Sequence, residues 1–206
     1  MNTHDLTTRL AKYIPAEAAP FCASIIIRYG VHVKITKVRS TKYGDYTAPY
    51  NGSGHKITIS YTTNKFSFLV TLLHELAHML TYEKYSNKNV APHGTEWKTE
   101  FSRLLHDCRY DGIFPPDLNK AIVKYASNPA ASSCTDPDLL RALRKYGKDV
   151  PSSYFLEELP ENTIFSLSNG KKFKKGPKLR KRYECMEISS KKLYLVDALA
   201  EVIPEN

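Results

Sequence analysis

Residues 65–108 read KFSFLVTLLHELAHMLTYEKYSNKNVAPHGTEWKTEFSRLLHDC, and this stretch decides the fold. Its first half is apolar on almost every side, which predicts a buried helix. Within that helix lies HELAH, the HExxH pattern. Residues four apart lie one turn apart on nearly the same helix face, so His74 and His78 can bind one ion. Glu75 then carries a carboxylate within reach of a water on that ion.

A zinc site that catalyses a reaction takes three protein ligands and leaves one position for water. His93 is the best candidate for the third ligand, because it follows a break at 86–92 and begins a second helical run. Histidines buried without a metal are the alternative, but uncompensated polar burial is costly and disfavours them. We therefore expect one Zn²⁺ per chain, held by His74, His78 and His93, with Glu75 as the general base.

The chain resembles the SprT-like zinc metalloproteases over residues 20–110. The motifs that carry this resemblance are HELAH at 74–78 and HGTEW at 93–97, which matches the HGxxW/F element of the family. A third motif is RSTKYGDY at 39–46, which is similar to the R-x-x-x-(W/Y/L)-G-x-Y segment of the bacterial members. The resemblance implies a zincin-like core and an endopeptidase that cleaves DNA-bound or DNA-crosslinked proteins.

Composition places the chain among ordinary globular proteins. It has 206 residues, of which 42% are hydrophobic and 25% are charged. No apolar run is long enough to span a membrane, and the first residues do not form a signal peptide. We expect no membrane partner and a cytoplasmic protein, associated with the nucleoid if the source is bacterial. Four dispersed cysteines without a CxxC pair predict reduced thiols: Cys22, Cys108, Cys134 and Cys185.

We expect an α+β protein in three segments. Residues 1–111 form the SprT-like metalloprotease core, with the HExxH helix and a small sheet. Residues 112–150 form a helical linker or cover, and residues 151–206 form a small β-rich basic module.

Apolar spacing predicts the other elements. Helices are expected at 1–14, 15–29, 117–126 and 137–146, and a second core helix follows Gly94. Strands are expected at 31–36, 56–61, 163–167, 179–185 and 192–196, with a loop or irregular hairpin at 39–54. One residue of Thr62, Thr63 and Asn64 caps the HExxH helix.

Fold analogy adds expectations about the cleft. In zincin-like folds an edge strand pairs with an extended peptide substrate, and Ile57–Tyr61 is either that strand or a plain core strand. Tyr43, Tyr46 and Arg39 are candidate transition-state or cleft residues if the 39–46 loop borders the cleft.

The C-terminal module carries a strongly basic strip. The whole chain has a net charge of +9 and a pI near 9.3, which suggests a polyanionic partner. Between Lys171 and Arg182 no residue is acidic, and Phe173 and Tyr183 interleave with the basic ones, so phosphates and bases can both be bound. We expect sequence-neutral binding of single-stranded or damaged DNA; the alternative is a solvated hairpin without a partner. The basic residues of the strip are Lys171, Lys172, Lys174, Lys175, Lys178, Arg180, Lys181 and Arg182.

The module departs from the family in one respect. It keeps RYEC at 182–185 but lacks the cysteine pairs of the family's C-terminal zinc ribbon, so no second metal is expected. Two other functions stay open beside the DNA-directed peptidase. One is a nucleic-acid-binding protein with a purely structural zinc, and the other is a metallopeptidase unrelated to DNA.

Overall fold

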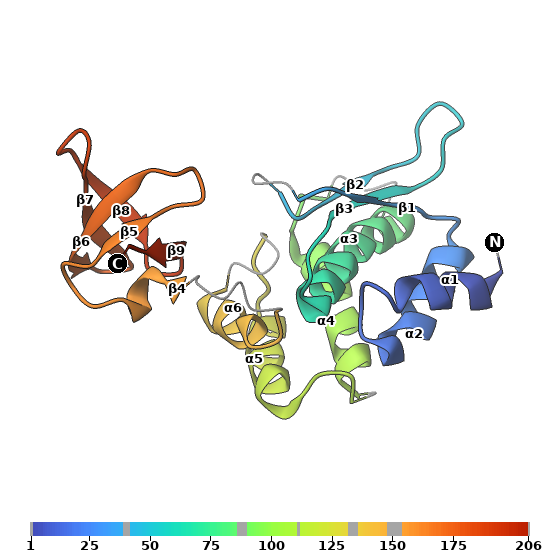
Figure 1. Ribbon diagram of the computed structural model, residues 1–206. Coiled ribbons are helices and arrows are strands. Elements are labelled where there is room, and N and C mark those ends of the chain that lie inside the picture. Colours follow the sequence, from blue (N-terminus) through green and yellow to red (C-terminus); the bar gives the residue numbers. More distant parts are fainter. Residues whose placement is uncertain are drawn as a thin grey trace. The chain divides into compact units, whose positions relative to one another are not determined.

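A computed structural model of the chain describes residues 2–38, 42–85, 90–110, 112–131, 136–147 and 154–205. The chain divides into two compact units, Met1–Gly147 and Lys148–Asn206. The first unit contains helices and a three-stranded sheet, and the second contains a six-stranded sheet, so the fold is α+β (Figure 1).

The first unit includes the two helices expected after the core, as α5 and α6. The expected N-terminal helices are shorter than their patterns indicated, and a short 3₁₀ turn separates them. The elements are α1 (Thr3–Leu10), η1 (Ala16–Ala18), α2 (Ala19–Arg28), β1 (His32–Thr36), β2 (Gly44–Thr47), β3 (Lys56–Ser60), α3 (Lys65–Tyr85), α4 (Thr95–Tyr110), α5 (Pro116–Ala126) and α6 (Pro137–Arg144).

The HExxH helix, α3, is the central element of this unit. It packs on β2 and β3 on one side and on α4 on the other, as Figure 1 shows. Its apolar residues, such as Leu69, Leu72 and Leu76, are fully buried. Each buried leucine contributes about 2 kcal/mol, so both faces of α3 hold it in the core. No helix in the described part of the chain is long and apolar enough to cross a membrane.

The sheet of the first unit has the strand order β1-β3-β2. Ile57 of β3 lies opposite Val33 in the parallel pair with β1 and opposite Tyr46 in the antiparallel pair with β2. Both edges of β3 are therefore paired. The expectation that Ile57–Tyr61 is a substrate-binding edge is wrong, and the strand is a core strand. The edge strand that contacts α3 is β2, which lies in the segment expected to be a loop or irregular hairpin.

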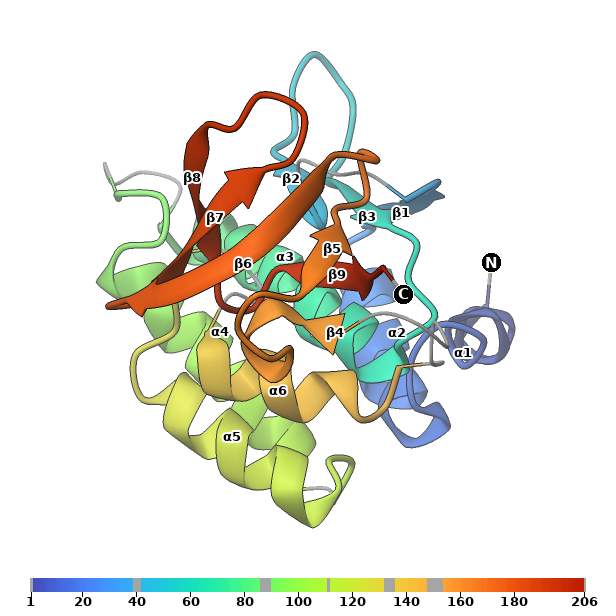
Figure 2. The same cartoon turned by 60° about the vertical axis from the view of Figure 1, so that its left-hand side comes forward.

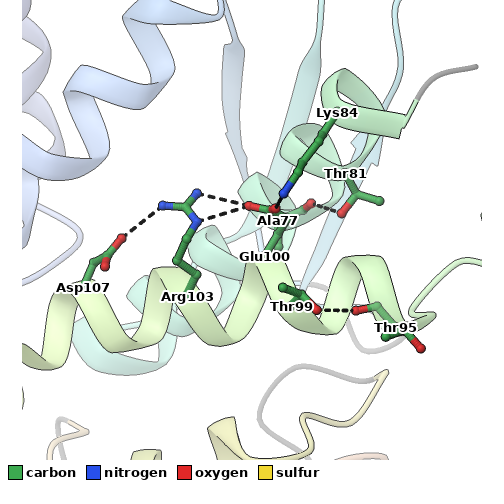
Figure 3. A network of polar contacts seen from close by, with 8 residues as sticks. All are labelled: Ala77, Thr81, Lys84, Thr95, Thr99, Glu100, Arg103 and Asp107. Atoms are coloured by element: carbon green, nitrogen blue, oxygen red, sulfur yellow. Dashed lines mark hydrogen bonds and ion pairs between the residues drawn. The ribbon is translucent and has the colours of Figure 1, made fainter.

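A buried carboxylate joins α3 to α4. Glu100 is only 4% exposed, and it accepts hydrogen bonds from Lys84 Nζ at 3.0 Å and from two Arg103 nitrogens at 3.2 Å (Figure 3). Arg103 also pairs with Asp107 at 3.2 Å. The two cations compensate the cost of burying the carboxylate. The network fixes α4, and with it the turn that carries His93, against α3.

The second unit is an antiparallel sheet in the order β4-β9-β5-β6-β7-β8. Figure 2 shows β6 as a long twisted strand beside β7. Its core includes Phe165, Phe173 and Cys185. The elements are β4 (Tyr154–Phe155), η2 (Leu156–Glu158), β5 (Ile164–Ser166), β6 (Lys172–Leu179), β7 (Arg182–Glu187), β8 (Leu193–Asp197) and β9 (Glu201–Pro204).

Most of the basic strip forms the hairpin β6–β7. The start predicted for the strand at 179–185 is wrong. Arg180 has a φ of 47°, and the chain reverses direction there. Leu179 therefore ends β6, and β7 begins at Arg182. A β-bulge between Lys175 and Lys178 interrupts the pairing of the two strands.

The described cysteines are buried in the two cores. Cys22, Cys108 and Cys185 are buried, whereas Cys134 lies outside the described residues. Burial raises the pKa of the Cys22 thiol well above its ordinary value.

Asn64 caps α3. Its side-chain oxygen accepts hydrogen bonds from the backbone N–H groups of Phe66 (3.1 Å) and Ser67 (3.0 Å). Its amide nitrogen donates to the carbonyl of Leu143 in α6 at 2.6 Å. One side chain therefore satisfies two orphan donors at the start of α3 and ties that start to α6.

Replacing Asn64 by alanine should lower the free energy of unfolding of the first unit by about 1–2 kcal/mol through the lost cap. The Leu143 carbonyl loses its hydrogen-bond donor at the same time, which lowers the free energy of unfolding by about another 1 kcal/mol. Trp97 is the only tryptophan and lies in this unit, so its fluorescence during urea unfolding measures the effect. Asn64→Asp keeps the acceptor and should recover the capping part. A loss no larger than that of the exposed control Thr63→Ala would contradict the capping role.

Candidate metal centre

Three histidines meet from two segments of the first unit. His74 and His78 lie one turn apart on α3, and His93 lies in the turn before α4. The φ of His93 is 60°, in the left-handed region that histidine, asparagine and aspartate adopt more readily than most residues. A hydrogen bond from the Gly94 N–H to the Ala91 carbonyl (2.9 Å) spans His93.

The Nε2 atoms of the three rings form a tight triangle. They are separated by 3.2 Å between His74 and His78, 2.9 Å between His78 and His93, and 3.2 Å between His74 and His93. Two nitrogens bound to one tetrahedral zinc at about 2.0–2.1 Å lie about 3.4 Å apart. The triangle is therefore close to the size that a single bound ion requires.

Hydrogen bonds alone do not account for this triangle. The Nε2 atom of a neutral imidazole is a donor or an acceptor, but not both. Among three such atoms, at least one pair must consist of two donors or two acceptors that face each other. A cation is attracted by all three lone pairs at once, and three imidazoles are a donor set that zinc accepts. The residues present therefore fit a metal ion.

The electrostatics of the site keep the ligands neutral. Burial lowers the pKa of His74 to about 3 and that of His78 to about 4, and the neighbouring imidazoles add to both shifts. Burial also lowers the pKa of His93. All three rings are therefore neutral at pH 7, so their lone pairs are available to a metal without the prior loss of a proton.

Trp97 supports all three rings from α4. Its ring centroid lies 4.7 Å from that of His74, 5.3 Å from that of His78 and 4.6 Å from that of His93. It is 1% exposed, and its Nε1 donates to the His74 carbonyl at 3.4 Å. His74 Nδ1 is buried and has no hydrogen-bond partner within the described residues. Aromatic packing by Trp97 and Phe101, rather than an outer hydrogen bond, therefore orients the His74 ring.

Glu75 lies against a glycine of the edge strand β2. Its side chain is 4% exposed. A Cβ atom at position 44 would lie 2.3 Å from Glu75 Oε1, so any larger residue at this point of β2 would force the Glu75 side chain to shift. We did not single out Gly44 from the sequence. The available signal was its place in the 39–46 motif, where the family segment also has glycine.

The three expected cleft residues have different environments. Tyr46 on β2 stacks parallel to His78, with ring centroids 6.4 Å apart and an interplanar angle of 2°. Its hydroxyl lies 2.9 Å from His55 Nδ1, and His55 is a residue that sequence reasoning missed. Tyr43 is 55% exposed, and its carbonyl accepts the Ser60 N–H at 2.7 Å. Arg39 lies outside the described residues.

The eight basic residues of the strip do not form one uniform surface. Lys171 pairs with Glu187 at 2.9 Å, and Lys172 pairs with Glu205 at 2.7 Å. Lys175 is only 4% exposed, because its ammonium group points inward, donates to the Leu159 carbonyl and lies 4.0 Å from the Tyr183 ring centroid. Burial lowers the pKa of Lys175. The remaining five are exposed: Lys174, Lys178, Arg180, Lys181 and Arg182.

Comparison with known proteins identifies the segment that contains this site. The sequence model of the SprT-like family matches residues 28–110, which include β2, HELAH and His93. This match confirms the resemblance carried by the three motifs. The family is metal-dependent and is associated with metallopeptidase activity. No curated protein and no solved structure matches the chain.

Removing one ligand should weaken metal binding strongly. We expect Co²⁺ to quench Trp97 fluorescence with a stoichiometry of one, because the ring lies against all three imidazoles. His93→Ala should raise the Kd at least about 100-fold, since the loss of even an outer partner costs 10–100-fold. The exposed histidine His4 supplies the control His4→Ala. Equal Kd values for His93→Ala and His4→Ala would exclude His93 as a ligand.

Proposed function

Because the sequence model of the SprT-like family matches residues 28–110, we propose that the chain is a zinc-dependent endopeptidase with a zincin-like core. The observation that carries the proposal is the Nε2 triangle of His74, His78 and His93, with Glu75 one residue after the first ligand. Three histidines leave one zinc position open, as a catalytic site requires, whereas structural zinc sites are usually closed and cysteine-rich. The same argument disfavours a purely structural zinc.

The three histidines would hold the ion and remain neutral while they do so. A zinc ion held there supplies a Lewis acid for the scissile carbonyl and lowers the pKa of a bound water to about 7. Glu75 accepts a proton from the attacking water and passes it to the nitrogen of the leaving amine. Gly44 lets β2 approach the Glu75 carboxylate closely, which restricts where that carboxylate can lie.

Strand β2 is the element that we assign to substrate binding. Within the described residues it pairs only with β3, so its other edge can accept an extended peptide as an added strand. Tyr46 lies on this strand beside His78, and Tyr43 lies just before it. Both tyrosines, together with Arg39, remain candidates for contacts with the substrate or its transition state.

The natural substrates that we propose are proteins bound or crosslinked to DNA. Support comes from the family resemblance and from the exposed basic residues of the β6–β7 hairpin. Such a hairpin suits sequence-neutral contacts to the phosphates of single-stranded or damaged DNA. This activity would belong in the cytoplasm, at the nucleoid of a bacterial cell.

A metallopeptidase unrelated to DNA is the second candidate. The observation that favours it is the partial neutralisation of the strip, since Lys171 and Lys172 are ion-paired and Lys175 points inward. These three residues are less available to phosphates than the sequence alone suggested.

Glu75→Gln should lower kcat for peptide cleavage by about 10²–10⁴-fold, because glutamine cannot accept the proton. Metal binding, followed through Trp97 fluorescence, should be unchanged. Gly44→Ala should also lower kcat, by about 100-fold, because its methyl group displaces the Glu75 carboxylate. Gly54→Ala in the same hairpin is the matched control, since its Cβ would meet only the Gly30 carbonyl at 3.6 Å. Full activity of Glu75→Gln would rule out Glu75 as the base.

Charge reversal in the hairpin separates the two candidates. Lys178→Glu combined with Lys181→Glu should weaken binding of single-stranded DNA and should reduce the salt dependence of log K by about 2, or about 1 per lost contact. Lys12→Glu with Lys120→Glu makes the same change in net charge at exposed positions of the first unit. If both pairs of substitutions weaken DNA binding equally, the hairpin is not the binding surface.

A further inference from the structure

A chain of hydrogen bonds runs from Tyr46, which stacks beside the ligand His78, to the end of α3. The Tyr46 hydroxyl lies 2.9 Å from His55 Nδ1, and His55 Nε2 lies 3.2 Å from Glu83 Oε1. Tyr46 is on β2, His55 directly precedes β3, and Glu83 is in the last turn of α3. Three elements that surround the site are therefore joined through one imidazole.

The His55 ring is buried and packs against two tyrosine rings. It is 7% exposed, stacks on Tyr46 with ring centroids 6.0 Å apart, and contacts Tyr82 edge-on at 5.9 Å. Most buried polar atoms in proteins have a hydrogen-bond partner, and here both nitrogens of the His55 ring have one. The side chain of Glu83 is 41% exposed, so the chain of hydrogen bonds begins at the surface and leads inward.

The chemistry of the partners fixes the direction of these hydrogen bonds. A carboxylate only accepts, so the Glu83 contact requires a proton on His55 Nε2. In the neutral ring Nδ1 is then an acceptor, and the Tyr46 hydroxyl must donate to it. The Tyr46 oxygen keeps its lone pairs for other groups, and its ring is fixed beside His78.

Fixing Tyr46 also fixes the rest of β2. Gly44, two residues earlier, lies against the Glu75 carboxylate, and β2 is a strand of only four residues that pairs with β3 alone among the described strands. A displacement of β2 would move the Gly44 contact of the general base and the edge that we assign to the substrate. The hydrogen bond between Tyr46 and His55 resists that displacement.

We propose that His55 is a positioning residue of the reaction: its hydrogen bond to Tyr46 holds β2 in register with the metal centre and Glu75, and Glu83 sets the tautomer of the ring that makes this bond. The proposal rests on the proposed peptidase activity and adds to it a requirement outside the ligands and the base. It requires the neutral His55 ring with its proton on Nε2.

Two substitutions at one position separate the two bonds of His55. Asparagine places a carboxamide oxygen near the position of Nδ1, so His55→Asn keeps an acceptor for Tyr46 and loses Glu83. Glutamine reaches toward the position of Nε2, so His55→Gln keeps a donor for Glu83 and loses the acceptor for Tyr46. A structural role in burial alone would make the two variants equally defective.

We expect His55→Gln to lower kcat at least about tenfold, in the range seen when an outer partner of a site is lost, with a smaller change in KM. His55→Asn should stay within about threefold of the wild type. In a Tyr46→Phe background, His55→Gln should have no further effect, because the bond is already absent. Co²⁺ quenching of Trp97 should be the same in all these variants. Equal kcat values for the Asn and Gln variants, or additive effects in the Tyr46→Phe background, would overturn the proposal.

A measurement on the wild type does not depend on activity. The ¹⁵N shifts of its histidines, with His55 assigned by its absence in His55→Gln, report which ring nitrogen carries the proton. A proton on Nε2 supports the chain of hydrogen bonds, and a proton on Nδ1 overturns it. If the wild type shows this tautomer but cleaves no peptide, the proposed function fails while the hydrogen-bond chain stands.

Discussion

The burial of the His74 imidazole and the Glu75 carboxylate in an apolar helix, with His78 half-buried beside them, is the constraint on which the first unit depends. Helix α3 is covered on both sides, so His74 and Glu75 lie where water cannot solvate a charge. Such burial is stable only if the rings stay neutral and the polar atoms find partners. The surroundings of these polar groups come from Trp97, from the turn at His93 and from the edge strand β2. Each of the three packs against α3 or its ligand rings.

Contacts of different kinds hold the elements of the first unit around these buried groups. Aromatic packing orients the ligand rings, a buried carboxylate network ties α4 to α3, and hydrogen bonds through His55 tie β2 to α3. Two of the ligands and the base come from the long helix α3, whereas the strand β2 beside them is short and at an edge. Side-chain contacts are therefore needed to hold β2 in a fixed position beside the site.

The sequence pattern predicted those parts of the molecule that are determined by interactions between residues close together in the chain. The helix around HELAH, its cap within residues 62–64 and the convergence of His93 follow from helical periodicity and from ligand spacing. The position of β3 in the centre of the sheet does not follow from local pattern, because strands pair with partners that are distant in the sequence. The contact of Gly44 with Glu75 and the inward direction of Lys175 were missed for the same reason, since neither leaves a periodic trace in the sequence.

The left-handed backbone at His93 has a consequence for how the site can change. Few residue types adopt this conformation easily, but aspartate and asparagine are enriched in it, as histidine is. An exchange of His93 for aspartate would replace one nitrogen ligand by oxygen while the turn kept its shape. Two histidines with a carboxylate are also an accepted zinc donor set. The backbone therefore permits a change of ligand class and of metal preference at this position, whereas the two helical ligands are confined by the core around them.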